Sequence, residues 1–346
     1  MIIGMKLISP ALRRSAVSSL AIILSALLSV AAGQQKTAIV AGGGSGGDGV
    51  PATQAKLERP FAVTFDSAGN LYIGEYEGCR VLKVDSAGVL TTIAGTGEKG
   101  FAGDGGPGIR AQFNRIHDVV TGPDGALYIA DSSNRRVRRI DLTTGIVTTF
   151  AGTGVGKTPT GDGAPADKAA LDGVASLFFD PYGTTLFLSG FSKSVRAIDM
   201  KTKIITTLKG IPGGRSIAVD SKDNLYVATG QTLGIRTSDG NFRILLDKTR
   251  TGGSDLPLGE SPKHLAIDAH DNVWICDEQH SMVREYLPAT DKLLTIAGNG
   301  KPGEQGLGGP PESLELNHPH GIYFQAPTGV IYIADSMNDR VIKIQP

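Results

Sequence analysis

One position of a repeated sequence pattern gathers side chains that can do chemistry. Six copies of the pattern each place one residue at the start of an apolar stretch, in chain order Phe61, His117, Ala175, Arg215, Lys263 and His320. Four of the six carry nitrogen. Imidazoles donate a lone pair to a metal or exchange a proton near neutral pH, whereas guanidinium and ammonium groups bind carboxylates and phosphates.

Two of these positions are followed at once by another residue with functional chemistry. The predicted ligand-binding residues are therefore His117, Asp118, Arg215, Lys263, His264 and His320. His117 and His320 are also the candidates for binding a divalent metal, with Asp118 orienting a ligand or serving as general base. Adjacent residues of a strand face opposite ways, so His264 is expected to point away from the ring that contains Lys263.

The copies themselves predict an all-β fold. Compare "GALYIADSSNRRVRRID" from Gly125 with "GVIYIADSMNDRVIKIQ" from Gly329. Each copy has two short β-rich runs joined by a polar turn. A strand such as "HLAIDA" precedes this hairpin, and in most copies a strand such as "LTTIAG" follows it. Period-two alternation between Gly, Asp and Asn turns favours antiparallel hairpins over helices. Four strands in each of six units predict a six-bladed β-propeller of four-stranded antiparallel blades. First strands line the channel of a propeller, so the six positions above should form a ring near one mouth.

The last copy indicates how the ring closes. It ends at "VIKIQP" without a fourth strand, whereas an unpaired "KTAIVAGG" stands at residues 36–43. We predict that this N-terminal strand completes the last blade, which would remove two exposed sheet edges.

These units resemble NHL repeats over residues 33–346, which the resemblance implies form one domain. The resemblance rests on an "LYIAD"-type strand followed by an Asn-x-Arg turn, seen at Asp131, Asn134 and Arg136 and again at Asp335, Asn338 and Arg340. The fifth copy departs, with His280 after Asp277. Glycine-rich connectors such as "GEKGFAGDGGPGIRAQF" resemble those of extracytoplasmic bacterial members. Recurrence of the acidic residue at one repeat position favours a turn-stabilising role.

A second, more distant resemblance concerns metal chemistry. The stretches "RIHDVV" and "HPHGIY" resemble strand openings of the peptidyl-hydroxyglycine amidating lyase, an NHL-type propeller. That resemblance implies zinc held by histidines of three alternating blades. The corresponding positions in this chain are His117, Arg215 and His320. A guanidinium cannot donate a lone pair, so this set departs from the family's at Arg215. No cofactor is certain; the candidates are zinc at the two histidines and weakly bound calcium at Asp104 and Asp162.

The N-terminus and the charge balance bear on location and partners. Residues 1–32 read as a cleavable signal peptide, with a basic start and the apolar run "SAVSSLAIILSALLSVAA". We therefore expect a secreted or periplasmic protein with no membrane span after cleavage, and a monomer. Three of the 34 basic residues precede residue 33, leaving 31 against 34 acidic ones, which argues against nucleic-acid binding. Cys79 and Cys276 are expected to be free, buried thiols.

Two functions of different classes follow. The first is a binding or scaffold propeller whose ring takes an anionic group of a small molecule, peptide or protein. The alternative is a metal-dependent lyase or hydrolase on the same ring, a chemistry that the strictosidine synthase and gluconolactonase propellers suggest at the level of fold only. The sequence leaves open whether the protein is an enzyme.

Overall fold

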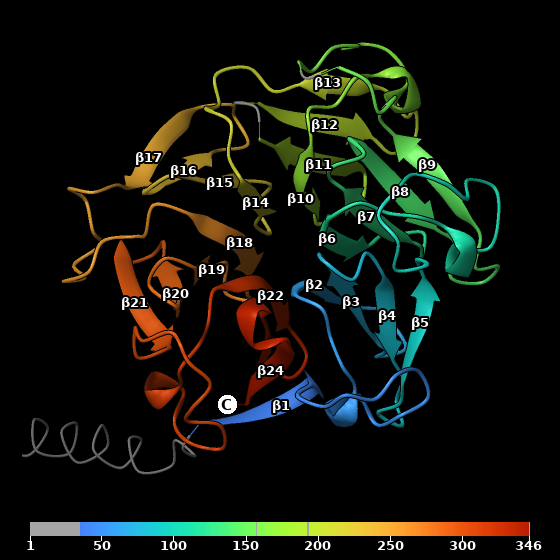
Figure 1. Cartoon of the computed structure of the whole chain (residues 1–346). Coiled ribbons are helices and arrows are strands. Elements are labelled where there is room, and N and C mark those ends of the chain that lie inside the picture. The colour runs from blue at the N-terminus through green and yellow to red at the C-terminus, as the bar shows by residue number, and fades with distance from the viewer. Residues whose placement is uncertain (1–34, 157, 192–193, 346) are drawn as a thin grey trace, which may run out of the picture.

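Six four-stranded antiparallel sheets stand around a central axis (Figure 1). The computed structural model describes residues 35–156, 158–191 and 194–345, and the numbers of strands and blades refer to these residues. The predicted six-bladed β-propeller is confirmed. The predicted signal peptide, residues 1–32, lies outside the described residues. Within these residues, no helix is long and apolar enough to cross a membrane.

Each blade runs from an inner strand at the channel to an outer strand at the rim. Blades one and two contain β2 (Pro60–Phe65), β3 (Leu71–Glu75), β4 (Val81–Val84), β5 (Leu90–Ala94) and β6 (Ile116–Thr121), β7 (Leu127–Asp131), β8 (Arg136–Ile140), β9 (Val147–Ala151). Blades three and four contain β10 (Val174–Phe179), β11 (Thr185–Gly190), β12 (Val195–Asp199), β13 (Ile205–Thr207) and β14 (Ser216–Val219), β15 (Leu225–Thr229), β16 (Thr232–Arg236), β17 (Phe242–Leu246). Blades five and six contain β18 (Pro262–Ile267), β19 (Val273–Asp277), β20 (Met282–Leu287), β21 (Lys292–Ala297) and β22 (Pro319–Gln325), β23 (Val330–Asp335), β24 (Arg340–Gln345), β1 (Lys36–Gly42). Short 3-10 turns lie at Ala52–Gln54, Gly108–Arg110, Ala166–Lys168, Pro311–Ser313 and Ser336–Asn338.

Blade six is closed by the N-terminal strand, as predicted. β1 pairs antiparallel with β24, in a register that runs from Lys36 opposite Gln345 to Gly42 opposite Arg340. Figure 1 shows the blue β1 beside the red C-terminal blade. The first and last strands of the ring are therefore hydrogen-bonded neighbours.

Side chains on both faces of the inner part of each sheet are buried because every blade is packed between two others. All five residues of β3, β7 and β19 are buried. The largest apolar clusters join adjacent blades; one of them brings Tyr72 of blade one together with Val119 and Leu127 of blade two. Cys79 and Cys276 are fully buried free thiols, as expected.

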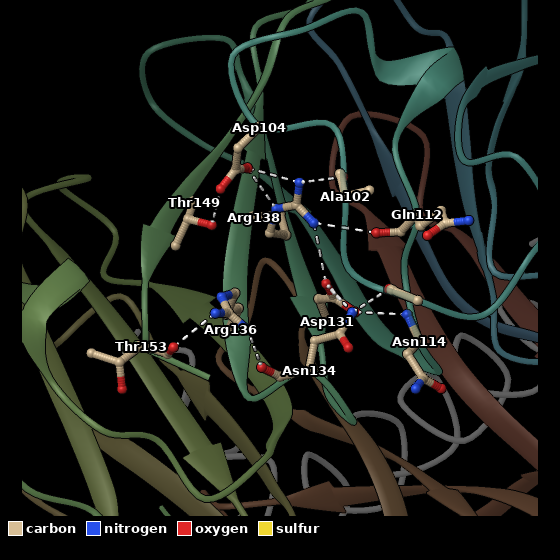
Figure 2. Close-up of polar contacts among 11 residues, drawn as sticks. Ala102, Asp104, Gln112, Asn114, Asp131, Asn134, Arg136, Arg138, Thr149 and Thr153 are labelled. Carbon is tan, nitrogen blue, oxygen red and sulfur yellow. Dashed lines mark hydrogen bonds and ion pairs between the residues drawn. The ribbon is translucent and has the colours of Figure 1, made fainter. Parts of the chain in front are cut away.

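The recurring acidic residue stabilises the turn, as predicted (Figure 2). Asp131 is fully buried and accepts hydrogen bonds from the Asn114 amide at 2.8 Å and from Asn134 Nδ2 at 2.9 Å. Arg138 Nη1 lies 3.4 Å from the same carboxylate. Burial raises the pKa of Asp131 to about 6, although these three partners lower it. The carboxylate therefore serves the blade rather than a ligand.

The arginine partner differs between blades. In blade six Arg340 Nε donates to Asp335 at 2.7 Å, but in blade two the motif residue Arg136 instead donates to the carbonyl of Thr153. Its place at Asp131 is taken by Arg138. Arg138 lies two residues after Arg136 on β8, where the strand is buried. Its side chain can therefore contact Asp131 inside the blade.

Blade five keeps the contact despite its different sequence. His280 Nδ1 lies 2.9 Å from Asp277 Oδ2, where blades two and six use Asn134 and Asn338.

The two connector aspartates considered for calcium are each paired with a buried arginine. Asp104 Oδ1 lies 2.7 Å from Arg138 Nη2, and Asp162 Oδ1 lies 2.7 Å from Arg196 Nη2. Each carboxylate also accepts a hydrogen bond from a threonine hydroxyl of the same blade. These contacts anchor the glycine-rich connectors to the blades.

Replacing Arg138 by Ala is expected to destabilise the protein by about 3–5 kcal/mol, because it leaves the buried Asp131 carboxylate without a cationic partner. Neither side chain of this pair has any exposed surface. Arg139→Ala is the matched control: its pair with Asp124 is partly exposed, so about 0–1 kcal/mol is expected. Chemical denaturation of both variants measures the difference, and equal losses would contradict it.

Candidate functional site

A β-bulge near the start of five of the six inner strands presents the ring residues to the channel; β14 pairs without a register shift, and Arg215 directly precedes it. The inner strands are β2, β6, β10, β14, β18 and β22, which face the centre in Figure 1. In blade two Ile116 pairs with Asp131 and Asp118 with Ala130, so His117 is an extra residue without a partner. Phe61, Ala175 and His320 occupy the same place in their blades. Bulges of this kind bend a strand and re-aim its side chains.

Five of the six ring positions line one cavity, of about 310 Å³, which we call the charged mouth. They are Phe61, His117, Arg215, Lys263 and His320. Ala175 is buried and does not reach the cavity. The blade-three side chain nearest to these residues is Phe191, whose ring lies 5.2 Å from that of His117 and 5.6 Å from the Arg215 guanidinium.

The charged mouth has an excess of positive charge. Its lining contains four cationic side chains, Arg59, Arg115, Arg215 and Lys263, and two carboxylates, Glu77 and Glu278. Lys263 is paired with Glu278 at 3.3 Å, and the same carboxylate lies 2.8 Å from His318 Nδ1.

Arg215 has no such partner. Among the described residues its guanidinium makes no ion pair, and its Nε is buried without a hydrogen bond. Burial lowers the pKa of Arg215, although Glu278 opposes the shift; an arginine still remains charged. An unpaired guanidinium inside a cavity leaves a fixed positive charge with unused donors.

The two ring histidines are neutral at physiological pH. Burial, together with Arg215, Lys263 and Arg115, lowers the pKa of His117 to about 3. Burial and the same Arg215 and Lys263, with His117, hold the pKa of His320 well below its usual range. The ring of His320 stacks on Phe61 at 3.7 Å between centroids, and its Nδ1 lies 3.1 Å from the Phe61 carbonyl oxygen. Nδ1 therefore carries the proton, and Nε2, which is buried without a partner, has a free lone pair.

The residues present do not fit a three-ligand zinc site. His117 and His320 offer lone pairs, and their ring centroids are 5.7 Å apart. The third corner is Arg215, whose charge repels a dication. No cluster of three or more His, Cys, Asp or Glu residues suited to a metal occurs in the described part of the chain.

Asp118 and His264 lie deeper in the channel. His264 Nε2 is 3.1 Å from Asp118 Oδ1, a contact that joins blades two and five, on opposite sides of the ring. Asp118 Oδ2 also accepts a hydrogen bond from the Leu177 amide at 2.7 Å. Burial lowers the pKa of His264, but Asp118 together with a backbone contact at Ile322 more than offsets this, so that the pKa is raised.

The expectation that His264 faces away from the ring was wrong, and the bulge explains why. Pro262 pairs with Asp277 and Leu265 with Ile275, so Lys263 and His264 together face one residue of β19. Simple alternation fails there. Lys263 lines the charged mouth, whereas His264 lines a second cavity farther along the channel.

This second cavity, of about 250 Å³, is called the apolar mouth. It is formed by the later residues of five inner strands, with Phe65, Phe179 and Phe324 among them. The inner strands run in one direction along the axis, so their first residues form the charged mouth and their last residues the apolar one. The Asp118–His264 contact lies between the two.

Other charged-mouth residues were not predicted from the sequence. Arg59, Arg115 and His318 each stand two residues before a ring position, and each has a left-handed backbone, with φ between 51° and 60°. Such a conformation is uncommon for residues other than glycine. Tyr76 and Glu278 directly follow the turn acid of their blades. The spacing of two residues before the ring position and the spacing of one residue after the turn acid both repeat between blades. A repeat alignment extended beyond the strands could therefore have identified these cavity residues.

The structure thus defines the class of the protein as a six-bladed β-propeller. No protein-family model matches the chain, so the NHL assignment stays a prediction. Among curated proteins, SUPPRESSOR OF QUENCHING 1 of Arabidopsis thaliana is 24% identical over 293 residues, covering 73% of this chain and 27% of that protein. Teneurin-4 of Homo sapiens is 30% identical over 208 residues, covering 55% of this chain and 7% of that protein. The chain therefore spans about a quarter or less of these relatives.

Solved structures share the fold at low sequence identity. An auxiliary nutrient binding protein from Bacteroides thetaiotaomicron has a TM-score of 0.67 at 15% identity, covering 90% of this chain and 76% of that one. Virginiamycin B lyase from Staphylococcus aureus has a TM-score of 0.54 at 13% identity, with coverage of 84% and 97%. A putative gluconolactonase has a TM-score of 0.57 at 13% identity, with coverage of 90% and 92%. Binding proteins and enzymes share this architecture.

Proposed function

We propose that the protein is an exported binding propeller whose charged mouth takes the anionic group of a small molecule, peptide or protein. The observation that carries the proposal is the unpaired guanidinium of Arg215, next to Lys263 and two neutral histidines. A carboxylate or phosphate would accept charge-assisted hydrogen bonds from Arg215, which can bind it with two parallel donors. His117 and His320 add neutral ring nitrogens at the same cavity.

Further observations agree with this function. The auxiliary nutrient binding proteins have the same fold, although their likeness in sequence is low. The predicted signal peptide and the resemblance to extracytoplasmic NHL proteins support a location outside the cytoplasm, in the periplasm or beyond the cell. We propose a monomer without a nucleic-acid partner.

Replacing Arg215 by Ala is expected to weaken binding of a carboxylate or phosphate ligand by about 1.5–3 kcal/mol, the range for a hydrogen bond to a charged group. Calorimetric titration with an anionic ligand found by screening measures the effect. The fold should be retained, because Arg215 makes no ion pair with any side chain that the structure describes.

Arg250→Ala is the matched control. Arg250 is an exposed arginine whose partner is Asp291 at 3.0 Å, and its loss should leave anion affinity unchanged. An anionic ligand whose affinity ignores both Arg215 and Lys263 would place the binding site elsewhere.

A lyase or hydrolase is the second candidate, and one observation favours it. His320 is held by the Phe61 carbonyl, and its Nε2 lone pair is free to accept a proton or a hydrogen bond from a substrate. A histidine-to-alanine variant of the similarly folded virginiamycin B lyase is described as catalytically inactive. Turnover of a bound ligand that His320→Gln abolishes without loss of binding would support this candidate over simple binding.

A further inference from the structure

The apolar mouth is separate from the charged mouth in both position and chemistry. Its described lining includes no Lys, Arg, Asp or Glu, so an ionic group would lose its hydration there without compensation. Its walls are mainly apolar, and its volume of about 250 Å³ suits a small organic molecule. Cavities that bind ligands commonly combine such walls with a few polar groups.

His264 is a polar group of this kind. Its side chain is only 8% exposed, and neither ring nitrogen has a hydrogen bond of good geometry, although Nε2 lies 3.1 Å from Asp118 and a weaker contact with the Ile322 backbone also raises the pKa of the ring. Buried polar groups in folded proteins are nearly always paired, so an unpaired one needs an explanation. At the equivalent positions of blades three and four, Ser176 and Ser216 accept amide hydrogen bonds from the next blade. Serine therefore satisfies this position of the fold in those blades, and blade five differs from them in carrying an imidazole.

We propose that the apolar mouth binds a small, uncharged organic molecule with an apolar body and one hydroxyl group, which pairs with His264. If the imidazole is neutral and its Nε2–H donates a hydrogen bond to Asp118, Nδ1 is an acceptor. If the ring is protonated, Nδ1 is a donor. A hydroxyl satisfies either form because it both donates and accepts. A carboxylate is disfavoured, because Asp118 already supplies a negative charge at this point and the walls supply no further cation.

The only tryptophan of the chain lies beside this cavity and can report on it. Trp274 pairs with Ala266 in the sheet, and its ring is 6.2 Å from that of Phe324; both Ala266 and Phe324 line the apolar mouth. A ligand bound there should change the emission of Trp274.

The test compares 2-naphthol with 2-methylnaphthalene, which has the same shape but no hydroxyl. Titrations monitored by Trp274 emission should show both probes binding, with 2-naphthol about two- to tenfold tighter, as one neutral hydrogen bond provides. In the double variant Asp118→Ser with His264→Leu, the two probes should bind equally. The serine imitates Ser176 and Ser216, so Leu177 keeps its acceptor.

A second measurement uses the unaltered protein, in case the double variant does not fold. With ¹⁵N-labelled histidine, 2-naphthol should shift the imidazole signals of His264 and leave those of His117 in place. Failure of the wild-type protein to bind either probe, a preference for 2-naphthol that survives the double variant, or shifts at His117 alone would each overturn the proposal. Since the charged mouth takes no part, the result is independent of anion binding.

Discussion

A protein lacking residues 36–42 should melt at a lower temperature than the protein that begins at residue 33, and should aggregate. These residues form β1, the outer strand of blade six. Deletion removes several ladder hydrogen bonds, each worth about 0.5–1.5 kcal/mol net. Their sum is a large share of the about 5–15 kcal/mol that stabilises most folded proteins.

The loss extends beyond the ladder. Ala41 is fully buried in the cluster that also contains Leu57 and Val341. Thr37 hydrogen-bonds with the connector at Gly308 and Gly309, so the loop before blade six would lose an anchor as well. The exposed edge of β24 would be free to pair with another chain.

Thermal melting and light scattering of the two proteins measure these effects. A synthetic peptide of residues 36–42 should raise the melting temperature of the truncated protein again, because it refills the vacant edge. A monomeric truncated protein with an unchanged melting temperature would contradict the role of β1.

Arg215→His should turn the charged mouth into a zinc site. The variant replaces a repelling cation by a third nitrogen ligand, opposite His117 and His320 on alternating blades. Three protein nitrogens and an open fourth position form the usual catalytic zinc arrangement. We expect zinc to bind on the order of 100-fold or more tightly than in the parent, since the loss of even an outer-sphere partner changes metal affinity 10–100-fold.

Competitive chelator titration of parent and variant checks this expectation. Adding His117→Ala to the variant should return the affinity toward that of the parent. No gain in the variant would mean that the three side chains do not converge, whereas a parent that already holds one zinc per chain would favour the metal-dependent enzyme.

The fold followed from the sequence because its signals are local and repeated. Alternating apolar residues and polar turns recur in six copies, so the strands of a copy with a weak pattern can be assigned by alignment with the other five. Blade six shows this best: the missing strand after "VIKIQP" and the unpaired "KTAIV" together implied the pairing of β1 with β24.

The site followed only in part. Repeat alignment identified the ring position, and Phe61, His117, Arg215, Lys263 and His320 do line one cavity. Simple strand alternation then failed at His264, because a bulge changes which way a side chain faces. The contact between Asp118 and His264 depends on the distance across the channel, which no local pattern encodes.

The bulge has one more consequence, for how such a protein can change over time. His117 and its equivalents in blades one, three and six stand outside the ladder, so they take no part in pairing β-strands. A substitution there alters what the channel recognises while the inherited framework stays the same. Each of these four blades thus offers a position that can change without altering the strand pairing, and a change at Phe61 or His320 also acts on the other, because their rings stack.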